Sequence, residues 1–189
     1  MAQILQKQIY IILTIFLFSF LTEGESKQFA TSLSQKSLHL KKEKLTHIHL
    51  YWHDVTGGDH PTKVTVVKAL DNTTNTYFGS VSVLDDALTV DPGVKSKIVG
   101  RAQGMHVASS QENFSIVMAL SFEFTGGEYN GSSLSLLGRN QVVYPKNEIP
   151  IVGGSGVFRF SSGYAIMQTY KFIPNLYGIL EMDFYVLHY

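Results

Sequence analysis

The chain has 189 residues with 15 basic and 15 acidic side chains, so it carries no formal net charge at pH 7. A balanced charge gives no electrostatic footprint for nucleic acid or for an anionic membrane, and neither is expected as a partner. The sequence contains no cysteine, which excludes disulfides, thiol catalysis and cysteine–metal sites.

Residues 1–24 predict a secretory signal peptide. Lys7 precedes an apolar run from Ile9 to Leu21, and small and polar residues follow around Gly24. The run is shorter than the roughly 20 residues that a membrane-spanning helix needs, which favours cleavage and secretion over an uncleaved anchor. Residues 25–44 are polar and predict a flexible arm. Residues 45–189 are then long enough for one domain with a sizeable core.

The stretch from His47 to Val55 predicts a strand with two different faces. Side chains alternate along a strand, so the histidines share one face while Leu50 and Trp52 lie on the other, followed by Asp54. In a core or cavity, desolvation would favour the protonated form of Asp54, which could then donate to a ligand. Alternatively, Asp54 begins the turn at residues 55–59, and the strand pattern alone favours this turn.

His47 and His49 have a spacing along the strand that suits a metal ion. No acidic or histidine partner is indicated nearby, and they face away from Asp54. An exposed or interface face is therefore favoured, and no metal site is predicted.

Most of the remaining chain predicts short strands separated by Gly, Pro and Asn turns. The clearest pattern is at 115–124, where apolar side chains alternate with polar ones before the turn at Gly126. Such a chain predicts a β-barrel or sandwich, and 10 Tyr and 12 Phe favour a barrel that holds one small ligand. The expected strands are 47–55, 64–70, 77–84, 98–108, 115–124, 132–137, 164–172 and 179–189.

Several distinctive segments follow one another along the domain. The segments are Leu50–Val55 (LYWHDV), Phe78–Val81 (FGSV), Leu84–Thr89 (LDDALT), Val99–Gly104 (VGRAQG), Tyr129–Ser132 (YNGS), Leu137–Asn140 (LGRN), Ile151–Phe160 (IVGGSGVFRF) and Val186–Tyr189 (VLHY). In this order and spacing they are highly specific, and from about Lys44 to Tyr189 the chain resembles the dirigent proteins of plants.

The resemblance implies an all-β fold, an eight-stranded antiparallel β-barrel of the dirigent and allene-oxide-cyclase type. It also implies a homo-oligomer, a trimer or dimer, that is secreted to the apoplast and has no cofactor. In this family a separate laccase or peroxidase makes phenoxy radicals from a monolignol such as coniferyl alcohol, and the barrel directs their coupling to optically active lignans. Some relatives instead act on quinone methides, for example closing the ring of a pterocarpan.

The resemblance also assigns candidate catalytic residues. It places a cavity carboxylate at Asp54, which favours a functional role there. Asp86 is a second candidate, with a turn beside Asp85 as the open alternative. His106 replaces a tyrosine of the family pattern and could serve as an acid, because a histidine pKa lies in the useful range.

Three further residues are expected to bind substrate: Trp52, Asn140 and Phe172. Asn140 stands where the lignan-forming subgroup has a second aspartate, and Asn147 stands where that subgroup has an arginine. An asparagine forms hydrogen bonds but delivers no proton at neutral pH. These departures put the substrate and the handedness of the product in question, but not the fold.

Asn72, Asn113 and Asn130 each begin an N-glycosylation sequon, which the signal peptide makes plausible acceptors. Three functions therefore stand as hypotheses. The first is stereoselective phenoxy-radical coupling without oxidant activity, and the second is acid-assisted cyclisation or dehydration of a quinone methide through Asp54. The third is a non-catalytic binding protein of the cell wall or of defence.

Overall fold

The computed structural model describes residues 29–70, 75–93 and 95–189, together with residues 3, 6–8, 10 and 12. Most of the predicted signal peptide, and the predicted glycosylation site Asn72, lie outside the described residues. Within the part described, no helix is long and apolar enough to cross a membrane. The chain forms two compact units, Met1–Leu40 and Lys41–Tyr189.

The first unit contains a short 3-10 helix, η1 (Gln35–Leu38), within the predicted arm. Ser34 precedes it, and its side-chain oxygen accepts a hydrogen bond from the backbone N–H of Ser37 at 3.2 Å. This is the usual capping role of serine at the start of a helix.

The second unit is built from strands and two single-turn 3-10 helices. Its elements in chain order are β1 (Lys44–Val55), β2 (Lys63–Val67), β3 (Val81–Thr89), β4 (Ile98–Ala108), β5 (Ser115–Phe124), η2 (Gly127–Tyr129), β6 (Ser133–Gln141), β7 (Lys146–Ser155), η3 (Gly156–Phe158), β8 (Ser162–Ile173) and β9 (Tyr177–His188).

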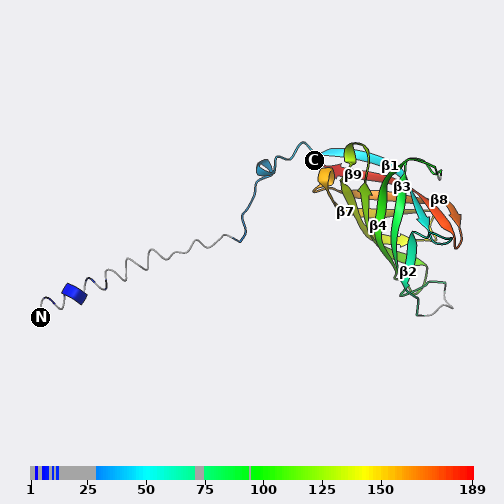
Figure 1. The fold of residues 1–189 in the computed structure, drawn as a ribbon, viewed down its shortest axis with the longest axis horizontal. Helices are drawn as coiled ribbons and strands as arrows, with labels where there is room; N and C mark the ends of the chain where they lie inside the picture. The colour runs from blue at the N-terminus through cyan, green and yellow to red at the C-terminus, as the bar shows by residue number, and fades with distance from the viewer. Residues whose placement is uncertain are drawn as a thin grey trace. The chain divides into compact units, whose positions relative to one another are not determined.

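Eight of these strands close into a ring. They run antiparallel in the order β1-β9-β8-β7-β6-β5-β4-β3, and β1 pairs with β3 through Tyr51–His53 to complete the circle. The short strand β2 pairs with the first half of β3 and stands outside the ring. Figure 1 shows the C-terminus of the chain beside the start of β1, as the pairing of Lys44 with His188 requires. The predicted eight-stranded antiparallel barrel is confirmed.

Two differences from the predicted strands affect the site. The expected turn alternative at Asp85 and Asp86 is wrong, because both residues lie within β3. Strand β7 was not predicted, since its start at Lys146 follows a single short turn and its sequence is interrupted by Pro150. Strands β4 and β5 have the predicted bounds.

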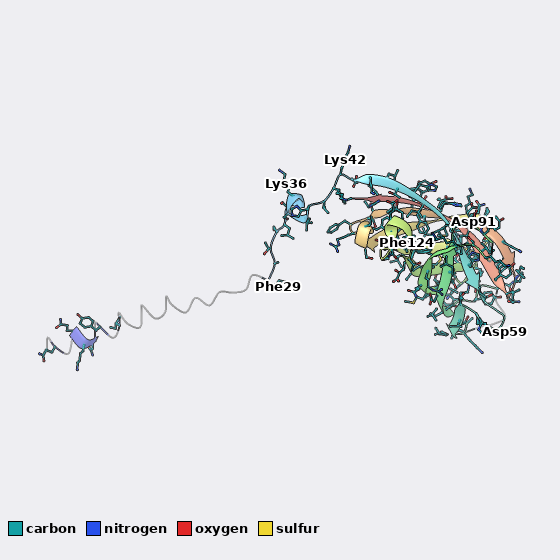
Figure 2. All side chains as sticks on the ribbon, turned by 45° about the horizontal axis from the view of Figure 1, so that its top comes forward. Phe29, Lys36, Lys42, Asp59, Asp91 and Phe124 are labelled. Carbon is teal, nitrogen blue, oxygen red and sulfur yellow. The ribbon has the colours of Figure 1, made fainter. Side chains whose placement is uncertain are left out.

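The interior of the barrel is packed at one end by aromatic rings. Phe158 contacts both Phe124 and His188 there, with ring centroids 5.7 and 5.0 Å apart. Further in, Phe122 packs edge-on against Trp52 and Phe184. Figure 2 shows Phe124 toward one end of the barrel and Asp59, in the loop after β1, toward the other. The residues that could bind a ligand lie beyond Phe122, toward that second end.

Candidate functional site

A cavity of about 360 Å³ opens inside the barrel. This volume lies within the range of pockets that hold small organic ligands. The cavity lining joins inward-facing side chains of the strands to the loops after β1, β6 and β8, including Asp54, Lys63, His106, Asn140, Trp52 and Phe172.

Asp54 lies on the inner face of β1, as the strand pattern required, and pairs with Gly178 of β9 rather than beginning a turn. The loop after β1 brings Lys63, the first residue of β2, back to it, and the Lys63 ammonium donates to Asp54 Oδ2. Both side chains are largely buried, at 13% exposure for Asp54 and 20% for Lys63. From the sequence, Asp54 was predicted to be a protonated acid in an apolar cavity. That prediction did not include Lys63, which is an ionic partner for Asp54.

Asp86 is fully buried on β3 and does not line the cavity. The Trp52 indole N–H donates to its Oδ2 at 2.6 Å, and the Thr62 hydroxyl donates to its Oδ1. Burial raises the pKa of Asp86 to about 6, with a smaller contribution from the Asp54 charge, and the two hydrogen bonds oppose the rise. Asp86 therefore lies behind the cavity wall and contacts it through the hydrogen bond from Trp52, which lines the cavity.

His106 is buried on the inner face of β4 and lines the cavity. Burial, helped by the Lys63 charge, lowers its pKa to about 3. A histidine that stays neutral above this pH does not act as an imidazolium acid near pH 7, so the low pKa argues against the acid role predicted from the sequence. It offers a hydrogen-bond donor or acceptor instead.

The two asparagines that depart from the family pattern play different parts. Asn140 is buried on β6 and lines the cavity. Asn147 holds the turn between β6 and β7, because its side chain accepts from the Gln141 N–H at 2.9 Å and donates back to the Gln141 carbonyl at 3.2 Å. Asn140 is therefore available to a ligand, whereas the side chain of Asn147 is largely used by the fold.

Phe172 on β8 lines the cavity and is 65% exposed, so it stands at the mouth. Tyr77 and Tyr144 also line the mouth and are about half exposed. These three aromatic side chains provide flat apolar surfaces around the entrance.

Three unpaired polar atoms converge on this cavity. Among the described residues, four buried side-chain N or O atoms have no hydrogen-bond partner. Three of them, Asp54 Oδ1, His106 Nε2 and Asn140 Oδ1, belong to residues that line the cavity. Buried polar groups are normally paired, so this clustering needs a partner that the folded chain itself does not supply.

The outer face of β1 differs from what the sequence indicated. His47 Nε2 lies 2.7 Å from Asp183 Oδ1, and His49 Nε2 lies 2.9 Å from Glu181 Oε1, so each histidine has an acidic partner on β9. The expectation of no acidic neighbour was wrong because the partners are more than 130 residues away in sequence. Within the described part of the chain, no group of three or more His, Asp or Glu side chains could hold a metal ion.

Sequence reasoning missed two residues of the site, Lys63 and Thr62. Neither lies in a distinctive motif, and their partners belong to β1 and β3. The usable signal was Lys63 itself, a charged residue at the start of a strand that is otherwise mostly valine. Its pairing with Asp54 depends on how the loop folds back.

These features define a closed antiparallel barrel with a ligand-sized, partly polar cavity. The family model for "Dirigent-like protein" matches residues 45–187. The chain belongs to the dirigent-like protein family.

Similar proteins agree with this assignment. The chain is 42% identical to dirigent protein 7 of Arabidopsis thaliana over 166 residues, covering 87% of this chain and 88% of that protein. It is also 42% identical to pterocarpan synthase 1 of Glycyrrhiza echinata over 161 residues, 84% of this chain and 86% of that one. The solved structure of a pterocarpan synthase dirigent protein matches with a TM-score of 0.77 at 41% identity, covering 85% of this chain and 99% of that structure.

Proposed function

We propose that the cavity binds a phenolic quinone methide and directs the addition of a hydroxyl group to it, without any oxidation by the protein. The observation that carries this proposal is the convergence of unpaired Asp54, His106 and Asn140 atoms on one cavity. Asp54 Oδ1 and Asn140 Oδ1 both accept hydrogen bonds, so they complement a ligand with hydroxyl groups. The similarity to pterocarpan synthases supports the same chemistry.

The Asp54–Lys63 pair suits the proton transfers of this reaction. When a hydroxyl oxygen attacks the exocyclic carbon of a quinone methide, a C–O bond forms, the ring becomes aromatic and the carbonyl oxygen gains negative charge. Lys63 can donate a proton to that oxygen, while Asp54 Oδ1 can accept the proton that the attacking hydroxyl loses. The reaction is an isomerisation, so it needs no oxidant or reductant.

The test is a stereochemical assay with an isoflavanol, which loses water to form the quinone methide, incubated without oxidant. We expect faster ring closure and one enantiomer in excess relative to the reaction without protein. Unchanged rate and a racemic product would contradict the proposal for this substrate class.

A second candidate function is stereoselective coupling of monolignol radicals made by a separate laccase or peroxidase. The exposed rings of Tyr77, Tyr144 and Phe172 at the mouth favour it, because they can stack a second aromatic ring. Coupled radicals also become quinone methides that close by the same proton transfers. Coniferyl alcohol and a laccase, with and without the protein, separate this function from the first. Racemic pinoresinol in both reactions would exclude it, and inertness in both assays would favour a binding protein without turnover.

We propose further that the protein is secreted to the apoplast after removal of residues 1–24, leaving residues 25–44 as an arm before the barrel domain at 45–189. The exposed side chain of Asn130, between η2 and β6, supports glycosylation there. Asn113 is half-buried, and its Oδ1 accepts from the Ser115 hydroxyl at 2.6 Å, so it is a poorer acceptor in the folded protein. Expression in plant cells, with glycosidase treatment of the Asn130→Gln and Asn113→Gln variants, tests both the location and the sites.

We also propose a homo-oligomer, a trimer or dimer, formed through the outer face of the barrel. A row of apolar side chains supports it, running in register across neighbouring strands: Val64, Val83, Met105, Ala119 and Leu137. Four of them are 40 to 50% exposed. These five residues form the outer apolar row. In the proposed oligomer, a second copy of the chain covers this row.

A further inference from the structure

Asp86 is a buried carboxyl that the proposed chemistry does not use directly. It is fully buried on β3, whereas its neighbour Asp85 points outward and binds Arg101 and Gln103 of β4. The two donors to Asp86 come from elements that build the cavity wall: Trp52 from β1, and Thr62 immediately before β2. Thr62 is followed at once by Lys63, which holds Asp54.

The hydrogen bonds around Thr62 can accommodate a proton on Asp86. With Asp86 ionised, the Thr62 hydroxyl donates to Asp86 Oδ1 and its oxygen accepts from the Val55 N–H at 3.2 Å. With Asp86 protonated, the acid can donate to the Thr62 oxygen, and the Thr62 hydroxyl can turn to the Val55 carbonyl, 3.5 Å away. Each state leaves the three groups paired, so the change needs no unfolding.

We propose that Asp86 is a proton-sensing positioning residue, whose own charge changes the electrostatic field on the Asp54–Lys63 pair from behind the cavity wall. It acts through Trp52 and Thr62 and does not touch the ligand. The effect on turnover rests on the function proposed above, whereas the proton sensing itself does not.

The charged groups around Asp86 define what its titration changes. Asp54 of β1 and Lys63 of β2 are the charges that act on it, and its β4 neighbour Ala102 carries none. Burial raises the pKa of Asp86 to about 6. Below this pH the site carries one negative charge fewer than above it. The charge of Lys63 is then less offset by Asp86, and stabilises a developing oxyanion more strongly.

The chain contains a single tryptophan, so its indole N–H gives one reporter signal for Asp86. In ¹⁵N-labelled purified protein we expect the Trp52 indole resonance to titrate with a midpoint near pH 6. Asp86→Asn should remove this titration, because the amide still accepts from Trp52 and donates to Thr62 but does not ionise. Asp85→Asn is the matched control on the same strand and should leave the midpoint in place.

Two further variants keep the proposal testable if Asp86→Asn folds poorly. Asp54→Asn removes a negative charge and should lower the midpoint by roughly 0.5 to 1 pH unit, and Lys63→Gln should raise it by a similar amount. A titration that persists in Asp86→Asn, or a midpoint that neither variant moves, overturns the proposal.

With an accepted substrate, the rate should rise as the pH falls through about 6, and Asp86→Asn should keep the high acidic rate at pH 8. A titrating indole signal in a protein inert toward every substrate would contradict the proposed function and leave Asp86 a proton sensor. Turnover without any indole titration would support the proposed function and contradict proton sensing by Asp86.

Discussion

At the level of single residues, His106 links the cavity to the pH dependence of folding. Its pKa is about 3 in the folded protein, against 6.5 for a free histidine. Between these values the unfolded chain binds a proton that the folded protein does not, so stability falls as the pH drops from 6.5 toward 3. Asp86 has the opposite sign, because its folded pKa of about 6 exceeds 3.8. The stability that its protonation contributes is present at low pH and is lost as the pH rises through 6.

We therefore predict that His106→Gln flattens the acid branch of the stability profile. The folded protein should lose on the order of a few kcal/mol between pH 6.5 and pH 3 because of His106, and the variant should lose less. Urea unfolding at pH 7 and pH 4, for both proteins, measures the difference. Equal losses in the two proteins would mean that His106 is not buried and neutral as described.

We predict that turnover depends on the Lys63 side chain. Its removal in Lys63→Met leaves Asp54 without its ionic partner, and removes the donor that the proposed function assigns to the carbonyl oxygen of the quinone methide. We expect turnover with an accepted substrate to fall about 100-fold, as for the loss of one oxyanion donor. Lys97, an exposed lysine that does not line the cavity, is the matched control, and Lys97→Met should keep the parental rate.

The sequence identified several residues of the site, but not their partners or their protonation. The strand pattern predicts the position of Asp54 on the inner face, and the family pattern marks His106 and Asn140. Lys63 was missed, since its role comes from a loop that returns it to β1. The low pKa of His106 was not predicted either, because burial causes it and a sequence does not give the burial of one side chain.

At the level of elements, β4 depends on a backbone that only glycine provides. Gly104 has a φ of +145°, and a Cβ there would lie 2.2 Å from the Ala119 carbonyl oxygen of β5. A methyl group at Gly104 would therefore push β5 away, two residues from His106, or force β4 out of the positive-φ conformation that glycine adopts without strain.

We predict that Gly104→Ala costs more than about 2 kcal/mol of stability, while Gly93→Ala stays within about 0.5 kcal/mol. Gly93 is the matched control because nothing lies within 4 Å of its added Cβ and its φ is not in the glycine-favouring region. Thermal or urea unfolding of both variants tests this. Similar stabilities would show that β4 and β5 can separate at Gly104 without cost.

The strands themselves were predictable where alternation is regular. β5 alternates apolar and polar residues over its whole length, and its predicted bounds hold. β3 continued through Asp85 and Asp86 because one carboxylate points out to Arg101 and the other points in to Trp52 and Thr62. Two adjacent acids normally indicate a turn, and only their separate partners explain why the strand continues.

For the molecule as a whole, the outer apolar row leads to a prediction about assembly. Met105 and Leu137 lie in this row and are each about half exposed. Met105→Glu and Leu137→Lys should each convert the proposed oligomer to monomers, because burying a charge in an apolar interface is costly. Light scattering after size-exclusion chromatography measures the mass. Glu123→Lys, an exposed charged position on β5 outside the row, is the control. A parental protein that is monomeric, or variants with unchanged mass, would contradict this role for the row.

The long pairing between β1 and β9 has a consequence for the timing of folding. Contacts such as that between His47 and Asp183 join residues 136 positions apart, so β1 has no long partner until almost the whole domain has been synthesised. Chains dominated by such distant pairings fold slowly. Asp54 pairs with Gly178 in the same late step. A nascent chain that stops before residue 177 therefore has most of the cavity wall but no cavity, and the site is completed only when the last strand arrives.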